Sequence, residues 1–190
     1  MLDLEAFLKA HQPKNSRFFT IVIDGRGGSG KSTFAKLLQA KLPGFVVLNG
    51  DDYFEPGNDP IVWGDFNDER FAHDVITSLK TQNSFTYRPY DWHADPHITE
   101  KQVKVTKGFC LERCYAFRFD LDWDLKIWVE TPKDVCLKRG IAREHMPKDR
   151  VLAAWNIWQQ QEDDYIRDFH PKPKADIIID GTKPFEEQLI

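Results

Sequence analysis

The residues from Gly25 to Ser32 read Gly-Arg-Gly-Gly-Ser-Gly-Lys-Ser and complete the phosphate-loop pattern G-x-x-x-x-G-K-[ST], also called Walker A. In such a loop the backbone N–H groups converge on the phosphates, the lysine adds a positive charge, and the final hydroxyl binds Mg²⁺. The pattern therefore predicts that this chain binds a nucleoside triphosphate. We expect the contacts to the nucleotide to come from Gly25, Arg26, Gly27, Gly28, Ser29, Gly30, Lys31, Ser32 and Thr33.

Carboxylates follow two apolar runs further along the chain. Asp51 and Asp52 come shortly after the run 45–48, and Glu112 closes the run that begins at Phe109. A charge that ends an apolar strand is costly to bury without a partner, and Mg²⁺ or a substrate hydroxyl would provide one. For the two aspartates a capping or turn role is the alternative, because aspartate is common in loops after strands.

Two arginines are placed so that both can reach the same ligand. Arg139 and Arg143 are four residues apart and share one face of a predicted helix. Guanidinium groups on one face can meet the same phosphate chain. The alternative is a solvated basic end of the helix.

The elements that must position these residues alternate along the chain. Apolar runs predict five strands, at 18–23, 45–48, 109–112, 125–129 and 175–179. Helical spacing predicts a short leading helix within 1–12 and further helices at 31–42, 68–80, 131–144 and 149–168. Shorter extended pieces are predicted at 87–92 and 102–106.

Apolar strands linked by helices predict an α/β fold. We expect a mainly parallel five-stranded sheet with helices on both faces and with ligands at the carboxyl ends of the strands. The glycine loop, the two aspartates and Glu112 all fall at that edge. The helix that starts at Lys31 would add the partial positive charge of its N-terminus to the anion site. An ordinary glycine-rich turn is the alternative, but it would not need Lys31 and Ser32 after its last glycine.

Length and composition limit the other possibilities. The chain has 190 residues, of which 41% are hydrophobic, so we expect one domain. The net charge of -4 and the absence of a long basic run argue against a nucleic-acid partner. The sequence shows no apolar stretch long enough for a membrane span and no signal peptide, so we expect a cytoplasmic protein without a membrane partner. The three cysteines form no CxxC pair and are expected to be reduced, buried and apolar.

The remaining motifs indicate which class of triphosphate-binding protein this chain resembles. The sequence contains neither the N-K-x-D pattern of a GTPase nor the L-S-G-G-Q pattern of an ABC-type ATPase. A small-molecule kinase needs a carboxylate for the proton of the acceptor, a Mg²⁺ site and cations over the transferred group. The carboxylates and arginines described above could meet these needs.

These motifs, in this order, resemble the uridine kinase and phosphoribulokinase group of P-loop kinases over nearly the whole chain. The segment 47–54 resembles the stretch in which an aspartate followed by aromatic residues acts as base. The segment 89–92 resembles the part of that family whose aromatic residues contact the nucleoside. Residues 111–112 resemble the strand whose glutamate lies near Mg²⁺, residues 138–144 the start of the lid, and residues 175–179 the last strand.

The resemblance implies a single P-loop kinase domain over residues 1–190, with a lid region at 139–150, that uses ATP and Mg²⁺. It implies that Asp51 is the base, that Lys31, Arg139 and Arg143 stabilise the transferred phosphoryl group, and that Ser32 with Glu112 or Asp52 holds the metal. A small hydroxylated acceptor would lie against Asp51, Phe54, Asp65, Tyr90, Trp92 and Glu112.

The acceptor itself stays open, because the chain departs from the family at two substrate positions. Arg113 stands where the family commonly has glycine, and Asp95 replaces its nucleoside-contacting histidine. A nucleoside such as uridine or cytidine is the first hypothesis. Pantothenate or a sugar phosphate is the alternative within kinases, and Arg88 and Arg113 could serve a sugar phosphate. A nucleotide-binding regulatory module without an acceptor is the alternative outside them.

Overall fold

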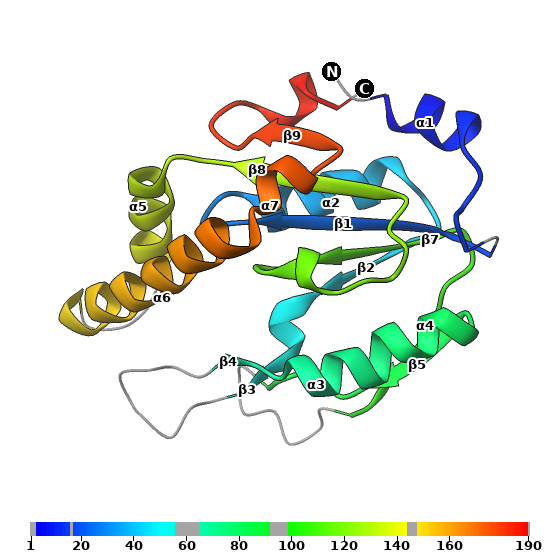
Figure 1. The fold of residues 1–190 in the computed structure, drawn as a ribbon, viewed down its shortest axis with the longest axis horizontal. Coiled ribbons are helices and arrows are strands. Elements are labelled where there is room, and N and C mark those ends of the chain that lie inside the picture. Colours follow the sequence, from blue (N-terminus) through cyan, green and yellow to red (C-terminus); the bar gives the residue numbers. More distant parts are fainter. Residues whose placement is uncertain (1–2, 16, 56–64, 92–98, 144–147, 190) are drawn as a thin grey trace.

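A parallel sheet forms the centre of the computed structural model, which describes residues 3–15, 17–55, 65–91, 99–143 and 148–189. Its five strands run in the order β2-β7-β1-β8-β9, and every neighbouring pair is parallel. The predicted α/β fold with a five-stranded parallel sheet is therefore confirmed (Figure 1). The strands are β1 Phe19–Gly25, β2 Phe45–Asn49, β7 Gly108–Glu112, β8 Leu125–Glu130 and β9 Ile177–Asp180.

Helices connect these strands, and their bounds lie close to the predicted ones. Helices α5 and α6 contact each other at one end of the sheet, where β8 leads into α5 (Figure 1). The described helices are α1 Leu4–Ala10, α2 Lys31–Lys41, α3 Asp68–Phe71, α4 Ser78–Thr81, α5 Lys133–Arg143, α6 Lys148–Phe169 and α7 Pro171–Lys174. A π-helical stretch, Ala72–Thr77, joins α3 to α4, so the predicted helix at 68–80 is one helical segment with a widened middle.

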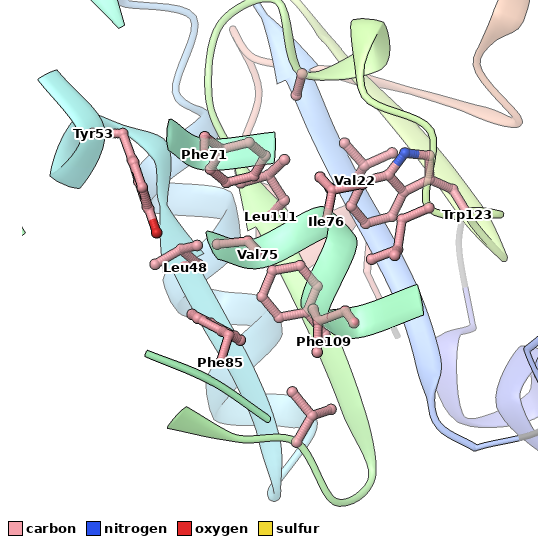
Figure 2. Close-up of a cluster of buried hydrophobic side chains, with 14 of the residues drawn as sticks. Val22, Leu48, Tyr53, Phe71, Val75, Ile76, Phe85, Phe109, Leu111 and Trp123 are labelled. Atoms are coloured by element: carbon pink, nitrogen blue, oxygen red, sulfur yellow. The ribbon is translucent and has the colours of Figure 1, made fainter. Parts of the chain in front are cut away.

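Two hydrophobic clusters cover the two faces of the sheet, because alternate residues of a strand point to opposite faces. On β1, Val22 belongs to one cluster, whereas Ile21 and Ile23 belong to the other. Figure 2 shows the first cluster, in which Phe71 and Val75 of the helical segment pack against residues of the sheet. Helices α1 and α2 supply the second cluster with Leu4, Phe34, Ala35 and Leu38.

Two antiparallel hairpins lie outside the main sheet. One pairs β3 Phe54–Glu55 with β4 Asp65–Phe66, and the other pairs β5 Ser84–Tyr87 with β6 Lys101–Lys104. The extended piece predicted at 87–92 was wrong in position, because β5 ends at Tyr87. Beyond it Pro89 has no N–H to donate, and the N–H of Tyr90 donates to the carbonyl of Asp52 (2.7 Å) instead of a neighbouring strand. Among the described helices, none is both long and apolar enough to cross a membrane.

The core of the sheet provides a test of this packing. Leu111 in β7 is fully buried, whereas Leu152 on α6 is 46% exposed. Replacing Leu111 by alanine should lower the free energy of unfolding by roughly 2–5 kcal/mol, because it removes buried methyl groups and leaves a cavity. The same change at Leu152 should cost no more than about 0.5 kcal/mol. Urea unfolding measures both, and similar losses in the two variants would contradict the packing.

Candidate active site

A cleft with a volume of about 230 Å³ opens at the carboxyl edge of the sheet. The segments that follow β1, β2 and β7 meet the N-terminus of α2 and one face of α5 there. The structure therefore brings together residues that the sequence places far apart. The cleft is lined by Gly27, Gly28, Gly30, Lys31, Ser32, Thr33, Asp51, Glu112, Cys114, Arg139 and Arg143.

The phosphate loop is a tight turn between β1 and α2. The N–H of Ser29 donates to the carbonyl of Arg26 (3.1 Å), and Gly30 immediately precedes the first residue of α2. Gly28 has a φ of +76°, and a Cβ on it would lie 2.4 Å from the carbonyl oxygen of Cys136. Only glycine combines that backbone conformation with such a close approach. The free N–H groups at the start of α2 face the same cleft and suit an anion.

Lys31 is buried at the base of this loop. Its ammonium group donates to the carbonyl of Arg26 (2.9 Å) and to the sulfur of Cys114 (3.2 Å). Burial by itself lowers the pKa of Lys31, but the acidic groups around it outweigh burial and raise the pKa above its ordinary value. Cys114 is the largest of these influences, but its thiol is protonated at neutral pH, where the carboxylates of Glu112, Glu162 and Asp24 are the groups that act on Lys31. Lys31 therefore keeps its positive charge at neutral pH.

Glu112 ends β7 and faces the same cleft with only 4% of its surface exposed. Burial raises the pKa of Glu112, and the nearby carboxylate of Asp51 raises it further. Lys31, a hydrogen bond from Ser32 and the charge of Arg143 act in the opposite direction. A cation in the cleft would therefore stabilise the ionised form of this glutamate.

The donor atoms of the cleft fit Mg²⁺ bound together with phosphates. Ser32 offers a hydroxyl and Glu112 a carboxylate, and hard oxygen ligands are what Mg²⁺ prefers. Within the described part of the chain, no group of three or more histidine, cysteine, aspartate or glutamate residues could hold a metal ion alone. Mg²⁺ commonly takes one or two protein ligands and completes its coordination with water and substrate phosphates.

The two neighbouring aspartates have different surroundings. Asp51 lies in the short 3₁₀ helix Gly50–Tyr53 after β2, is exposed, and lines the cleft. The carboxylate of Asp52 accepts a hydrogen bond from the hydroxyl of Tyr87 (2.7 Å), and Asp52 is not among the residues that line the cleft. The geometry therefore favours Asp51 for chemistry and gives Asp52 a structural partner.

Arg139 and Arg143 both line the cleft from α5, as their spacing predicts. The guanidinium group of Arg139 donates to the carbonyl of Gly181 (2.9 Å), beyond the last strand. The guanidinium carbon of Arg143 lies 5.6 Å from the ring centre of Trp155 on α6. Arg139 also lies within 3.5 Å of the carbonyl of Ser29 in the phosphate loop, so both arginines share the cleft with that loop.

The predicted acceptor residues are only partly within the described structure. The rings of Phe54 and Tyr90 meet edge to face, with centres 4.9 Å apart. The backbone of Asp65 is paired with that of Glu55 in the β3–β4 hairpin. Trp92 and Asp95 lie outside the described residues, as do residues 144–147 of the predicted lid.

Arg113 is buried and is not among the residues that line the cleft, although its side chain donates to the carbonyl of Cys114 (3.2 Å). Its guanidinium group pairs with Asp68 (2.8 Å), and the guanidinium carbon lies 4.2 Å from the ring centre of Phe66. It therefore joins the end of β7 to the segment that starts α3. This partner makes Arg113 a poor candidate for binding a phosphorylated acceptor.

Sequence reasoning missed two groups beside Lys31. Asp24 is the penultimate residue of β1 and is fully buried. Its carboxylate accepts hydrogen bonds from the N–H groups of Gly25 (2.6 Å) and Phe117 (3.0 Å) and from the hydroxyl of Tyr165 (2.7 Å). Burial raises its pKa. The sequence signal that could have identified Asp24 is its position directly before the first glycine of the loop.

Cys114 corrects the expectation that every cysteine is buried and apolar. Cys110 and Cys136 are buried, but Cys114 is only partly buried and lines the cleft. Burial raises the pKa of Cys114 to about 12, so the thiol is protonated at neutral pH. No local pattern in the sequence marks it as a cleft residue.

Comparisons with known proteins agree with this geometry. A family model described as AAA domain matches residues 21–170. A uridine kinase of Ureaplasma parvum is 28% identical over 157 residues, which cover 71% of this chain and 75% of that protein. Nicotinamide riboside kinase 2 of Mus musculus is 25% identical over 178 residues, which cover 86% of this chain and 87% of that protein.

The fold is also similar to a solved structure. A possible uridine kinase from Bacillus stearothermophilus superimposes with a TM-score of 0.65 at 19% identity, covering 93% of this chain and 99% of that one. Together with the sequence relatives, this likeness confirms the predicted resemblance to P-loop kinases of the uridine kinase group.

Lys31 tests the phosphate site. Replacing Lys31 by alanine should weaken MgATP binding about 10- to 100-fold, because a hydrogen bond to a charged group contributes about 1.5–3 kcal/mol. Isothermal titration calorimetry measures the change. Lys36, which is exposed on the same helix, is the matched control, and its alanine variant should bind like the wild type. Equal affinities in the Lys31 variant and the wild type would contradict the site.

Proposed function

We propose that this chain, which belongs to the protein family described as AAA domain, is a kinase that transfers the γ-phosphoryl group of ATP to a hydroxyl of a nucleoside. One observation carries the proposal: the phosphate loop, Asp51, Glu112 and the two α5 arginines line one cleft. A site that only bound nucleotide would not need an exposed carboxylate in the same cleft as the lysine of the loop. The likeness to uridine and nicotinamide riboside kinases supports the reaction class.

The donor half of the site stabilises negative charge. The transition state of phosphoryl transfer spreads charge over the equatorial oxygens of the γ-phosphoryl group, so fixed cations lower its energy. Lys31 approaches from the loop, and Arg139 and Arg143 approach from α5. Because Lys31 is buried and held by the carbonyl of Arg26, it needs little reorganisation when phosphate arrives.

Ser32 and Glu112 are the residues that would hold Mg²⁺. When bound, the ion would neutralise charge on the phosphate oxygens. Glu112 suits this role because its carboxylate is buried beside the hydroxyl of Ser32. The alternative ligand is Asp52, whose carboxylate already accepts a hydrogen bond from the hydroxyl of Tyr87. Glu112 is therefore favoured over Asp52 as the Mg²⁺ ligand.

Asp51 is the proposed base. Its carboxylate would accept the proton of the acceptor hydroxyl as that oxygen attacks the phosphoryl group. Exposure in the cleft leaves it open to an incoming hydroxyl. The 3₁₀ helix fixes its backbone, because the N–H of Asp51 donates to the side chain of Asn49 (3.0 Å).

A nucleoside is the proposed acceptor. The relatives at 28% and 25% identity are named for ribosides, uridine and nicotinamide riboside, which share the ribose and differ in the nucleobase. We therefore propose the riboside class and not a particular nucleobase. Phe54 follows shortly after Asp51 in the sequence, and its ring together with that of Tyr90 offers aromatic surface for a nucleobase. A sugar phosphate is less favoured, because Arg113 is already paired with Asp68.

The acceptor is tested by a coupled assay that follows ADP release from MgATP. The panel contains uridine, cytidine, nicotinamide riboside, pantothenate and several sugar phosphates. We expect acceptor-dependent release with at least one riboside. Release only with pantothenate or a sugar phosphate would contradict the nucleoside proposal, and nucleotide binding without any acceptor-dependent release would favour a regulatory module.

Asp51 tests the mechanism. Replacing Asp51 by asparagine should lower the transfer rate about 10²- to 10⁴-fold, the usual contribution of a general base, while MgATP affinity stays close to that of the wild type. Rates come from single-turnover assays and affinity from calorimetry. Asp134, exposed in the first turn of α5, provides a control Asp→Asn variant with unchanged rate. If Asp52→Asn rather than Asp51→Asn stopped transfer, the assignment of the base would be wrong.

A further inference from the structure

A buried glutamate on α6 contacts the phosphate loop from outside the cleft. The Oε1 atom of Glu162 accepts a hydrogen bond from the N–H of Gly27 at 2.6 Å, across 135 positions in the sequence. Glu162 is only 5% exposed and is not among the residues that line the cleft. It therefore touches the loop without facing the place where a nucleotide would lie.

The same face of α6 also holds α5. Trp155, Gln159 and Glu162 are separated by four and three residues, so they lie along one face of the helix. The side-chain amide of Gln159 donates to the carbonyl of Lys133 (2.9 Å) at the start of α5. The ring of Trp155 packs against α5 where residue 140 is a glycine, and a Cβ there would lie 2.1 Å from that ring.

Charge pairs reinforce this contact. Arg26 of the loop lies 3.4 Å from Glu162 and 2.6 Å from Asp163, and Asp163 also pairs with Lys133 of α5. Burial raises the pKa of Glu162, while the hydrogen bond from Gly27 and the charges of Lys31 and Arg26 lower it. A buried carboxylate is costly, and Glu162 does not line the cleft, so its burial needs a structural or positional reason.

We propose that Glu162 is a positioning residue for phosphoryl transfer. By binding the N–H of Gly27, it holds the loop in its cradle shape and sets the loop at a fixed place relative to the arginines of α5. The inference rests on the proposed kinase function only for its effect on catalysis. Its effect on the loop itself is independent of any acceptor.

Two substitutions separate the hydrogen bond from the charge. Glu162→Gln keeps an oxygen at the same reach but removes the negative charge. Glu162→Asp keeps the charge but shortens the side chain by one carbon–carbon bond, about 1.5 Å, so it no longer reaches Gly27. Asp168→Asn, an exposed carboxylate on the same helix, is the control.

The first readout is hydrogen exchange at the amide of Gly27, which requires no activity. We expect this amide to exchange slowly in wild type, Glu162→Gln and Asp168→Asn. In Glu162→Asp it should exchange at least tenfold faster. Equal protection in all four proteins would overturn the proposal.

The second readout is MgATP affinity by calorimetry. Glu162→Asp should bind about tenfold more weakly than wild type, and Glu162→Gln should stay within about threefold, because the bond and not the charge fixes the loop. Tighter binding by Glu162→Gln with unchanged Glu162→Asp would mean that the charge repels phosphate, which overturns positioning.

The two proposals fail in different ways. If wild type binds MgATP but phosphorylates no acceptor, the kinase proposal fails while the loop measurements still decide the role of Glu162. If wild type is an active kinase and Glu162→Asp matches it in exchange and affinity, only the role of Glu162 is wrong.

Discussion

The buried charge of Lys31 is the constraint on which the site depends. An ammonium group removed from water is costly unless acidic groups surround it, and here three carboxylates do so from separate elements. Asp24 comes from β1, Glu112 from β7 and Glu162 from α6, and all three raise the pKa of Lys31. Each carboxylate is itself buried and needs its own hydrogen bonds. Satisfying one cation therefore brings the ends of β1 and β7 and a residue of the distant helix α6 together around Lys31.

This arrangement explains how a small cleft could be prepared for a polyphosphate. The loop is bound on its outer side by α6, and its inner side faces the cleft. Arg139 of α5 donates to the carbonyl of Gly181 beyond the last strand and lies within 3.5 Å of the carbonyl of Ser29, so the arginine helix is also connected to the loop. Preorganised cations and donors cost little reorganisation when charge develops on a transferred group.

Much of the fold and part of the site could be predicted from local pattern. Apolar runs gave the strands, and the order of strand, glycine loop and helix gave the position of Lys31. What failed depended on contacts between distant segments. Glu162 looks like any polar helix residue until α6 meets the loop, and the partial exposure of Cys114 follows only from tertiary packing. Asp51 and Asp52 have similar sequence surroundings. In the 3₁₀ helix that contains both, however, Asp51 lines the cleft and Asp52 accepts a hydrogen bond from Tyr87.

We propose that this cleft moves a phosphoryl group from ATP to a hydroxyl, and phosphorus NMR of the protein with MgATP and a nucleoside follows the phosphorus atom itself. If transfer occurs, the γ-phosphate signal disappears as signals of ADP and of a phosphate monoester grow in equal amounts, without inorganic phosphate. Formation of inorganic phosphate alone, or an unchanged ATP spectrum with every nucleoside, would contradict it.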